Sequence, residues 1–78
     1  MDEPRDICQL ADGEEALLGD MNLPEATGDR LREMGLLPGA TVKLIRRAPL
    51  GCPIEFELGG SRLALRRADA AQIFVQQS

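Results

Sequence analysis

The amino-acid sequence predicts a mainly β protein: one small barrel of about five strands with a single inserted α-helix. Short segments that are rich in β-branched residues, or that alternate between apolar and charged residues, recur from residue 41 onward. The pair Gly59-Gly60 separates two of these segments, as in a two-residue β-hairpin. Because a single small sheet would leave its edge strands open, we expect the strands to close into a barrel.

The strand predictions rest on local alternation and on turn residues. Ile54–Leu58 alternates strictly between apolar and acidic side chains, which predicts one buried and one solvated face. Glu14–Met21 is too short for its period to separate helix from strand, and the nearby turn residues favour a strand. Residues 7–13 indicate a short turn of helix or strand that ends at Gly13. The expected strands are residues 14–21, 41–48, 54–58, 61–67 and 72–76, with a short helical turn at 68–71.

One helix is predicted between Pro24 and Met34. Proline is tolerated in a first helical turn, where its missing N–H group needs no partner. Acidic residues lie early in this segment and the bases Arg30 and Arg32 lie late, which suits the helix dipole. Gly35 can adopt the left-handed conformation that ends many helices.

The chain of 78 residues has the length of one domain. We expect residues 1–6 to form a flexible tail and residues 7–78 to form a single domain. The charged N-terminus is unlike a secretion signal, and no apolar run approaches the roughly 18 residues of a membrane span. A cytoplasmic protein without direct membrane insertion is therefore expected, with Cys8 and Cys52 as free thiols.

Charge is distributed unevenly along the chain. Residues 1–29 hold nine acids and one base, whereas residues 30–78 hold eight bases and four acids. The two halves either pack together and offset each other's fields, or form an acidic and a basic face that would steer a partner.

The residue types argue against an enzyme. The chain has no histidine, so it lacks the usual general base near neutral pH. Cys52 lies in a glycine-proline loop without a base in the sequence around it. Glu55 and Glu57 share one strand face and are interpreted as surface carboxylates, one of which could pair with Arg62 on the returning strand.

A resident cofactor is not expected, because strong transition-metal sites combine several histidines or closely spaced cysteines. Weak binding of ferrous iron or another divalent metal stays open. The candidate metal ligands are Cys52, Glu55, Glu57 and Asp69.

Nucleic acid is not expected as a partner either. The chain is acidic overall, with a net charge of −4, and its two aromatic residues, Phe56 and Phe74, occupy apparent core positions. Binding to nucleic acid usually requires a coherent basic surface, often with exposed aromatic side chains for stacking.

Three motifs in order resemble those of the ferrous iron transport protein A (FeoA) family. They are Leu31–Gly39 with its Met-Gly-Leu-Leu-Pro-Gly end, the Ala48–Ile54 loop with Ala-Pro-Leu-Gly-Cys-Pro, and the Leu-Ala-Leu-Arg strand at residues 63–66. The resemblance covers roughly Ile7 to Val75.

This resemblance implies an SH3-like fold and a role in ferrous iron uptake. Family members are small cytosolic proteins that accompany a membrane ferrous iron permease with a cytosolic GTP-binding domain. The present chain would then dock onto that region and be recruited to the inner face of the membrane, with Leu50 as an apolar anchor. The candidate partner-binding residues are Met34, Gly35, Leu36, Pro38, Gly39, Pro49, Leu50, Gly51, Cys52 and Pro53.

Two alternatives to docking are carried forward. The protein could instead bind ferrous iron directly, as a carrier or sensor. It could also self-associate as a homo-oligomer through its apolar loop.

Overall fold

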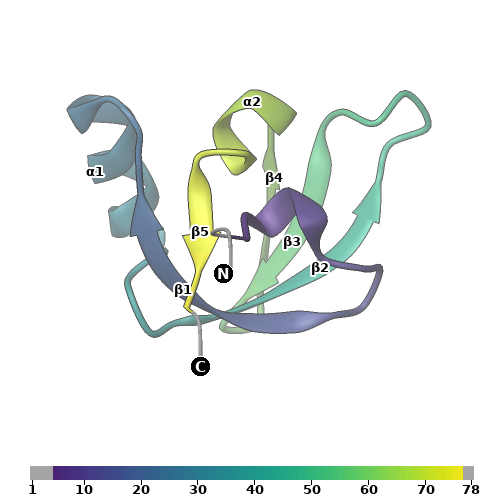
Figure 1. Cartoon of the computed structure of the whole chain (residues 1–78), viewed down its shortest axis with the longest axis horizontal. Helices are drawn as coiled ribbons and strands as arrows, with labels where there is room; N and C mark the ends of the chain where they lie inside the picture. Colours follow the sequence, from purple (N-terminus) through teal and green to yellow (C-terminus); the bar gives the residue numbers. More distant parts are fainter. Residues whose placement is uncertain (1–4, 77–78) are drawn as a thin grey trace.

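The computed structural model describes residues 5–76 and confirms the mainly β class (Figure 1). Five strands form one antiparallel sheet in the order β4-β3-β2-β1-β5. Within the described residues, no helix is long and apolar enough to cross a membrane. The elements are η1 (Ile7–Gln9), β1 (Glu15–Met21), α1 (Glu25–Glu33), β2 (Thr41–Arg47), β3 (Ile54–Leu58), β4 (Ser61–Leu65), α2 (Arg67–Ala70) and β5 (Ile73–Val75).

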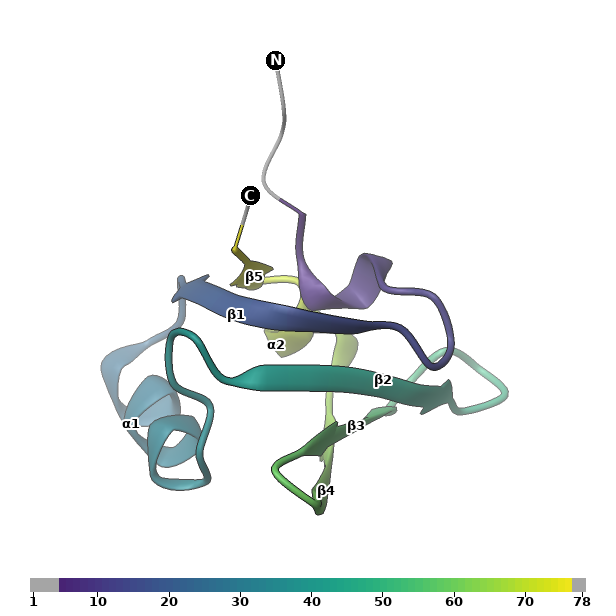
Figure 2. The same ribbon diagram turned by 90° about the horizontal axis from the view of Figure 1, so that it is seen from below.

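The sheet bends strongly, because β1 belongs to two ladders. Its first half pairs with β2 and its second half pairs with β5. Register shifts between Leu18 and Met21, and between Leu44 and Arg46, add local bends of the kind that β-bulges produce. In Figure 2 the strands wrap around the interior and α2 lies behind β1, whereas Figure 1 shows α2 at the top, where it connects β4 to β5. Among residues 5–76, closure between these two edge strands comes from α2 and not from strand pairing.

The interior of this curved sheet is purely apolar in the described part of the chain. Phe56 is fully buried, as expected, whereas Phe74 is only half-buried and lies outside the core cluster, which corrects its predicted core position. Phe74 sits on the short edge strand β5, where one side of the chain faces outward. The buried cluster comprises Ile7, Leu10, Leu18, Leu31, Leu36, Val42, Leu44, Ile54, Phe56, Leu58, Leu65, Ala70 and Ile73.

Helix α1 begins and ends close to the predicted positions. Pro24 is the N-cap, one residue before the first helical residue, where its missing N–H group leaves no donor unpaired. Gly35 has a φ angle of 104°, which favours glycine, and its N–H group donates to the Arg32 carbonyl over 2.9 Å. The N–H group of Leu36 donates to the Leu31 carbonyl over 3.0 Å, and the Leu36 side chain enters the core.

The N-terminal segment covers one edge of the sheet. Of the predicted tail, residues 1–4 lie outside the described residues. Arg5 and Asp6 are part of the folded domain: the N–H group of Val75 donates to the Arg5 carbonyl over 2.8 Å, and Asp6 forms a β-bridge with Phe74. The Asp6 carboxylate also accepts the N–H group of Cys8 over 2.8 Å and thereby caps η1.

Candidate partner-binding surfaces

The loop between β2 and β3 presents one apolar side chain to solvent. Two backbone hydrogen bonds hold the loop: Gly51 N–H donates to the Ala48 carbonyl over 2.7 Å, and Ala48 N–H donates to the Pro53 carbonyl over 3.1 Å. Gly51 has a φ angle of 87°, which suits the turn because glycine has no Cβ. Leu50 lies at this turn and is 96% exposed. An apolar residue held this way can enter a pocket of a partner with little loss of conformational entropy.

Both cysteines contact the backbone of the same residue in α2. The Arg67 N–H group donates to the Sγ atom of Cys52 over 3.4 Å, and the Cys8 thiol donates to the Arg67 carbonyl over 3.6 Å. Both are free thiols, as predicted. Burial raises the pKa of Cys8, and the neighbouring Asp6 carboxylate raises it further, so Cys8 stays a thiol near neutral pH. Cys52 is exposed and fastens the end of the Leu50 loop to α2.

The second predicted segment, Met34–Gly39, divides into exposed and buried positions. Leu36 is fully buried, so its side chain cannot contact a partner, which corrects its place among the candidate contact residues. Met34 and Leu37 are about half exposed, at 54% and 49%. Gly39 donates its N–H group to the Leu18 carbonyl over 2.7 Å, which fixes the turn that leads into β2. The accessible part of this segment is therefore Met34, Leu37 and the turn around Pro38.

The two predicted segments lie at opposite ends of the molecule. In Figures 1 and 2, α1 lies at the left end of the molecule and the β2–β3 loop lies at the right end. The molecule measures 32 × 28 × 23 Å along its principal axes. Met34 and Leu50 therefore belong to two separate surfaces, and the helix end and the loop do not form the one docking surface that their joint place among the candidate residues implied.

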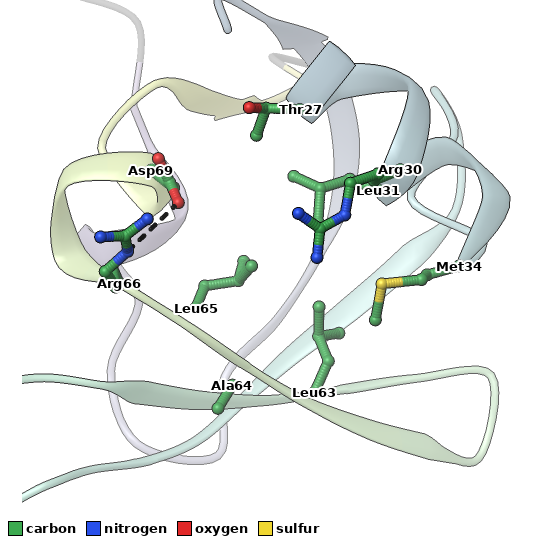
Figure 3. A pocket seen from close by; sticks show the side chains of 9 residues that line it. All are labelled: Thr27, Arg30, Leu31, Met34, Leu63, Ala64, Leu65, Arg66 and Asp69. Carbon is green, nitrogen blue, oxygen red and sulfur yellow. Dashed lines mark ion pairs between the residues drawn. The ribbon is translucent and has the colours of Figure 1, made fainter. Parts of the chain in front are cut away.

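A hollow between α1 and β4 was not anticipated from the sequence. Figure 3 shows Arg30, Met34 and Leu63 turned toward a common space at this place. The cavity has a volume of about 290 Å³, and Asp69 of α2 is one of its lining residues. Its lining residues are Thr27, Arg30, Leu31, Met34, Leu63, Ala64, Leu65, Arg66 and Asp69.

The spacing of the apolar residues that line this hollow is visible in the sequence. Leu31 and Met34 are three residues apart on one helix face, and Leu63 and Leu65 alternate along one strand face. Only the packing of α1 beside β4 shows that Met34 and Leu63 remain partly accessible at the rim.

The candidate metal ligands lie apart or pair with arginines. Glu55 contacts Arg46 on β2, with Oε1 3.4 Å from Nε, and the Asp69 carboxylate lies 4.0 Å from Nε of Arg66. In the part of the chain that the structure describes, no three histidine, cysteine, aspartate or glutamate side chains are grouped closely enough to hold a metal ion.

The strand register shows which glutamate of β3 lies opposite Arg62. Arg62 lies directly opposite Glu57 on the neighbouring strand. Glu55 pairs instead with Arg46 on the other side of β3. Within residues 5–76, no ion pair of 4.0 Å or less joins Arg62 to an acid, so its guanidinium is available at the surface.

A family model for the FeoA domain matches residues 6–77, almost the whole chain. The chain belongs to the FeoA family. A curated relative from Porphyromonas gingivalis, the Fe(2+) transport protein A/Fe(2+) transporter FeoB fusion protein, is 30% identical over 70 residues. The match covers 90% of the present chain but only 8% of that relative. The FeoA family is thus involved in ferrous iron transport. In the P. gingivalis relative, the FeoA part is joined to FeoB in one chain.

Solved structures of FeoA proteins share the fold described above. The solution structure of FeoA from Chlorobium tepidum matches with a TM-score of 0.84 at 32% identity, covering 92% of this chain and 70% of that one. The crystal structure of Stenotrophomonas maltophilia FeoA complexed with zinc matches with a TM-score of 0.75 at 28% identity, covering 91% and 88%. That protein is described as an SH3 domain protein, so the SH3-like fold expected for this FeoA-family chain is confirmed.

Proposed function

We propose that this FeoA-family protein is a non-enzymatic accessory protein of ferrous iron uptake that docks onto the cytosolic GTP-binding region of a membrane ferrous iron permease. It acts in the cytoplasm and is recruited to the inner face of the membrane through this partner. The docking contact is centred on Leu50. Docking itself needs no bound metal, and the iron is the cargo of the permease.

The fusion of FeoA and FeoB in the P. gingivalis relative supports this partner. Joining two modules in one chain makes their encounter intramolecular and raises their effective concentration. Such a fusion is useful when the two modules work in contact. Two modules that work in contact need a contact surface on each of them.

The observation that carries the proposal is the exposure of Leu50. At 96% exposure it is the most exposed large apolar residue in the described part of the chain. Its position on a hydrogen-bonded turn, between Pro49 and Gly51, limits the conformations that binding would have to freeze out. Central apolar residues of this kind often dominate the binding energy of an interface.

The test is an NMR titration of the ¹⁵N-labelled protein with the purified cytosolic GTP-binding domain of the matching permease. We expect amide shifts in residues 49–54 without metal, and their loss in the Leu50→Asp variant. Leu37→Asp is the matched control, because Leu37 is an exposed leucine at the opposite end of the molecule. It should bind like the unmodified protein.

Ferrous iron is then added to the protein alone. If the permease domain causes no shifts, while iron perturbs Cys52, Glu55 or Glu57, docking is wrong and direct iron binding takes its place. If Leu37→Asp abolishes the shifts and Leu50→Asp does not, the docking surface lies at the α1 end.

A further inference from the structure

The two edges of the sheet are treated differently by the chain itself. The outer edge of β5 is covered, because Val75 N–H donates to the Arg5 carbonyl and Asp6 bridges to Phe74. The opposite edge is β4. Among residues 5–76, β4 pairs only with β3, so its other side offers unpaired backbone groups. An open strand edge is a template on which a further strand can pair.

The geometry of the hairpin identifies which backbone groups face outward. Gly59 and Gly60 both have positive φ angles, 58° and 85°, as in the type I′ turn of a two-residue hairpin. The turn is closed by the pair Leu58 and Ser61, the first of five uninterrupted pairs between β3 and β4.

Hydrogen-bonded and non-hydrogen-bonded pairs alternate along an antiparallel ladder. Counting from the closing pair Leu58–Ser61, the pairs that contain Arg62 and Ala64 are of the non-hydrogen-bonded kind. The N–H and C=O groups of Arg62 and Ala64 therefore point away from β3, toward the open edge. No bulge or proline interrupts this edge, unlike the edges that proteins protect against further pairing.

Two hollows meet at the same edge. The cavity between α1 and β4 lies on the inner face, where Leu63 and Leu65 line it (Figure 3). A second, shallower hollow of about 330 Å³ lies on the outer face, lined by Glu55, Arg62, Leu63 and Ala64. Leu63 and Ala64 line both hollows. A strand added along β4 would direct its alternating side chains into one hollow and the other.

The arginines around the edge favour an acidic occupant, because Glu55, the acid that lines the outer hollow, already pairs with Arg46. Neither Arg30 nor Arg62 forms an ion pair within the described residues. The side chain of Arg66 is 83% exposed and lies 4.0 Å from the Asp69 carboxylate. Carboxylates on the outer face of an added strand would lie beside Arg62, and apolar side chains on its inner face would lie beside Leu63.

We propose that the β4 edge binds an extended protein segment of alternating apolar and acidic residues, which adds to the sheet as a sixth strand. Backbone hydrogen bonds to Arg62 and Ala64 supply the pairing, and the two hollows select the side chains. This inference goes beyond docking through Leu50, because it concerns a different surface and holds for any protein that supplies such a segment.

A second copy of the chain fits this edge poorly. If two β4 edges paired with each other, their outward positions Arg62, Ala64 and Arg66 would face one another across the symmetry axis. Guanidinium groups would then lie opposite or next to guanidinium groups, and like charges placed across a strand pair are destabilising. The acidic segment is the occupant that the charges of the edge match.

The test uses a defined probe, the blocked peptide Glu-Leu-Glu-Val-Glu-Leu-Glu, with Lys-Leu-Lys-Val-Lys-Leu-Lys as its charge-reversed control. Binding is measured by ¹⁵N shifts, and hydrogen exchange is measured at individual amides. We expect the acidic peptide to shift residues 61–66 and to slow exchange at the N–H groups of Arg62 and Ala64. Docking of side chains without strand addition would leave this exchange unchanged.

Two substitutions separate backbone pairing from charge. Ala64→Pro removes an outward N–H group at a position where an edge strand tolerates proline, and should weaken peptide binding at least about tenfold. Ala64→Val keeps the N–H group and should bind the acidic peptide nearly as well as the unmodified protein. Arg62→Glu should weaken binding of the acidic peptide and improve binding of the lysine peptide.

The proposal is overturned if the acidic peptide fails to bind, or if it binds without protecting the amides of Arg62 and Ala64. Equal binding of both peptides would also overturn it, since the charge argument would then be wrong. Protection of these amides that rises with protein concentration alone would make a second copy the occupant. Because Leu50→Asp leaves this edge intact, loss of permease binding in that variant does not affect the result.

Discussion

The guanidinium group of Arg5 forms a bidentate ion pair with the carboxylate of Glu14. Its Nη1 and Nη2 atoms donate to Oε2 and Oε1 over 3.0 and 2.9 Å. Glu14 also accepts the N–H group of Ala11 over 2.8 Å. The hydrogen bonds from Arg5, followed by the one from Ala11, lower the pKa of Glu14. This contact holds the residues that cover the edge of β5.

The first prediction concerns pH. Because the pKa of Glu14 is lower in the folded state, its contribution to stability is present above the ordinary glutamate pKa, about 4.3, and is lost as pH falls through the folded value. Glu14→Gln should lower the melting temperature at pH 7, and the difference should shrink as the pH falls below the ordinary glutamate pKa. Thermal unfolding at several pH values measures this. Glu15→Gln, at an exposed neighbour, should show a smaller effect at pH 7; a pH-independent loss in Glu14→Gln would contradict the prediction.

The second prediction concerns the end of α1. A Cβ atom at Gly35 would lie 3.2 Å from Cδ2 of Leu58, and the φ angle of 104° is unfavourable for other residues. Gly35→Ala should therefore lower the free energy of unfolding by about 1–3 kcal/mol in urea titrations. Gly13→Ala is the control: it has a φ angle of 82° but no atom within 4 Å of the added carbon. Equal losses in both variants would show that the contact with Leu58 contributes nothing.

The third prediction separates two adjacent leucines. Leu36 is fully buried, so Leu36→Ala should lower the free energy of unfolding by about 2–5 kcal/mol. Leu37 is 49% exposed, and Leu37→Ala should change it by less than about 0.5 kcal/mol. Urea unfolding followed by circular dichroism measures both. Similar losses would mean that Leu36 is not the residue that enters the core.

The fourth prediction concerns thiol reactivity. Burial and the Asp6 carboxylate raise the pKa of Cys8, which lowers its thiolate fraction, whereas Cys52 is exposed. Iodoacetamide at pH 8 should therefore modify Cys52 before Cys8, as followed by peptide mass spectrometry. The Cys52→Ser variant should retain only the slow site. Equal rates at both cysteines would contradict the assigned environments.

Local patterns predicted most of the secondary structure, because they act over a few residues. The strict alternation of Ile54–Leu58 and the Gly59-Gly60 turn predicted the β3–β4 hairpin. Gly35 correctly predicted the end of α1. Leu36 was misassigned to the docking surface, because the bond of its N–H group to the Leu31 carbonyl turns the chain back into the core. No local pattern distinguishes a leucine that follows a helix outward from one that turns inward.

What the sequence by itself determined is the class of fold, the family and the presence of an apolar loop around Leu50, since these depend on residue types and their spacing. Only the tertiary structure decided which surfaces exist. It separated Met34 from Leu50, placed α1 beside β4, and covered one edge of the sheet with Arg5 and Asp6 while leaving the other without a strand partner in the described residues. The physical reason is that surfaces arise from contacts between segments distant in sequence, and those contacts follow from how the bent sheet packs.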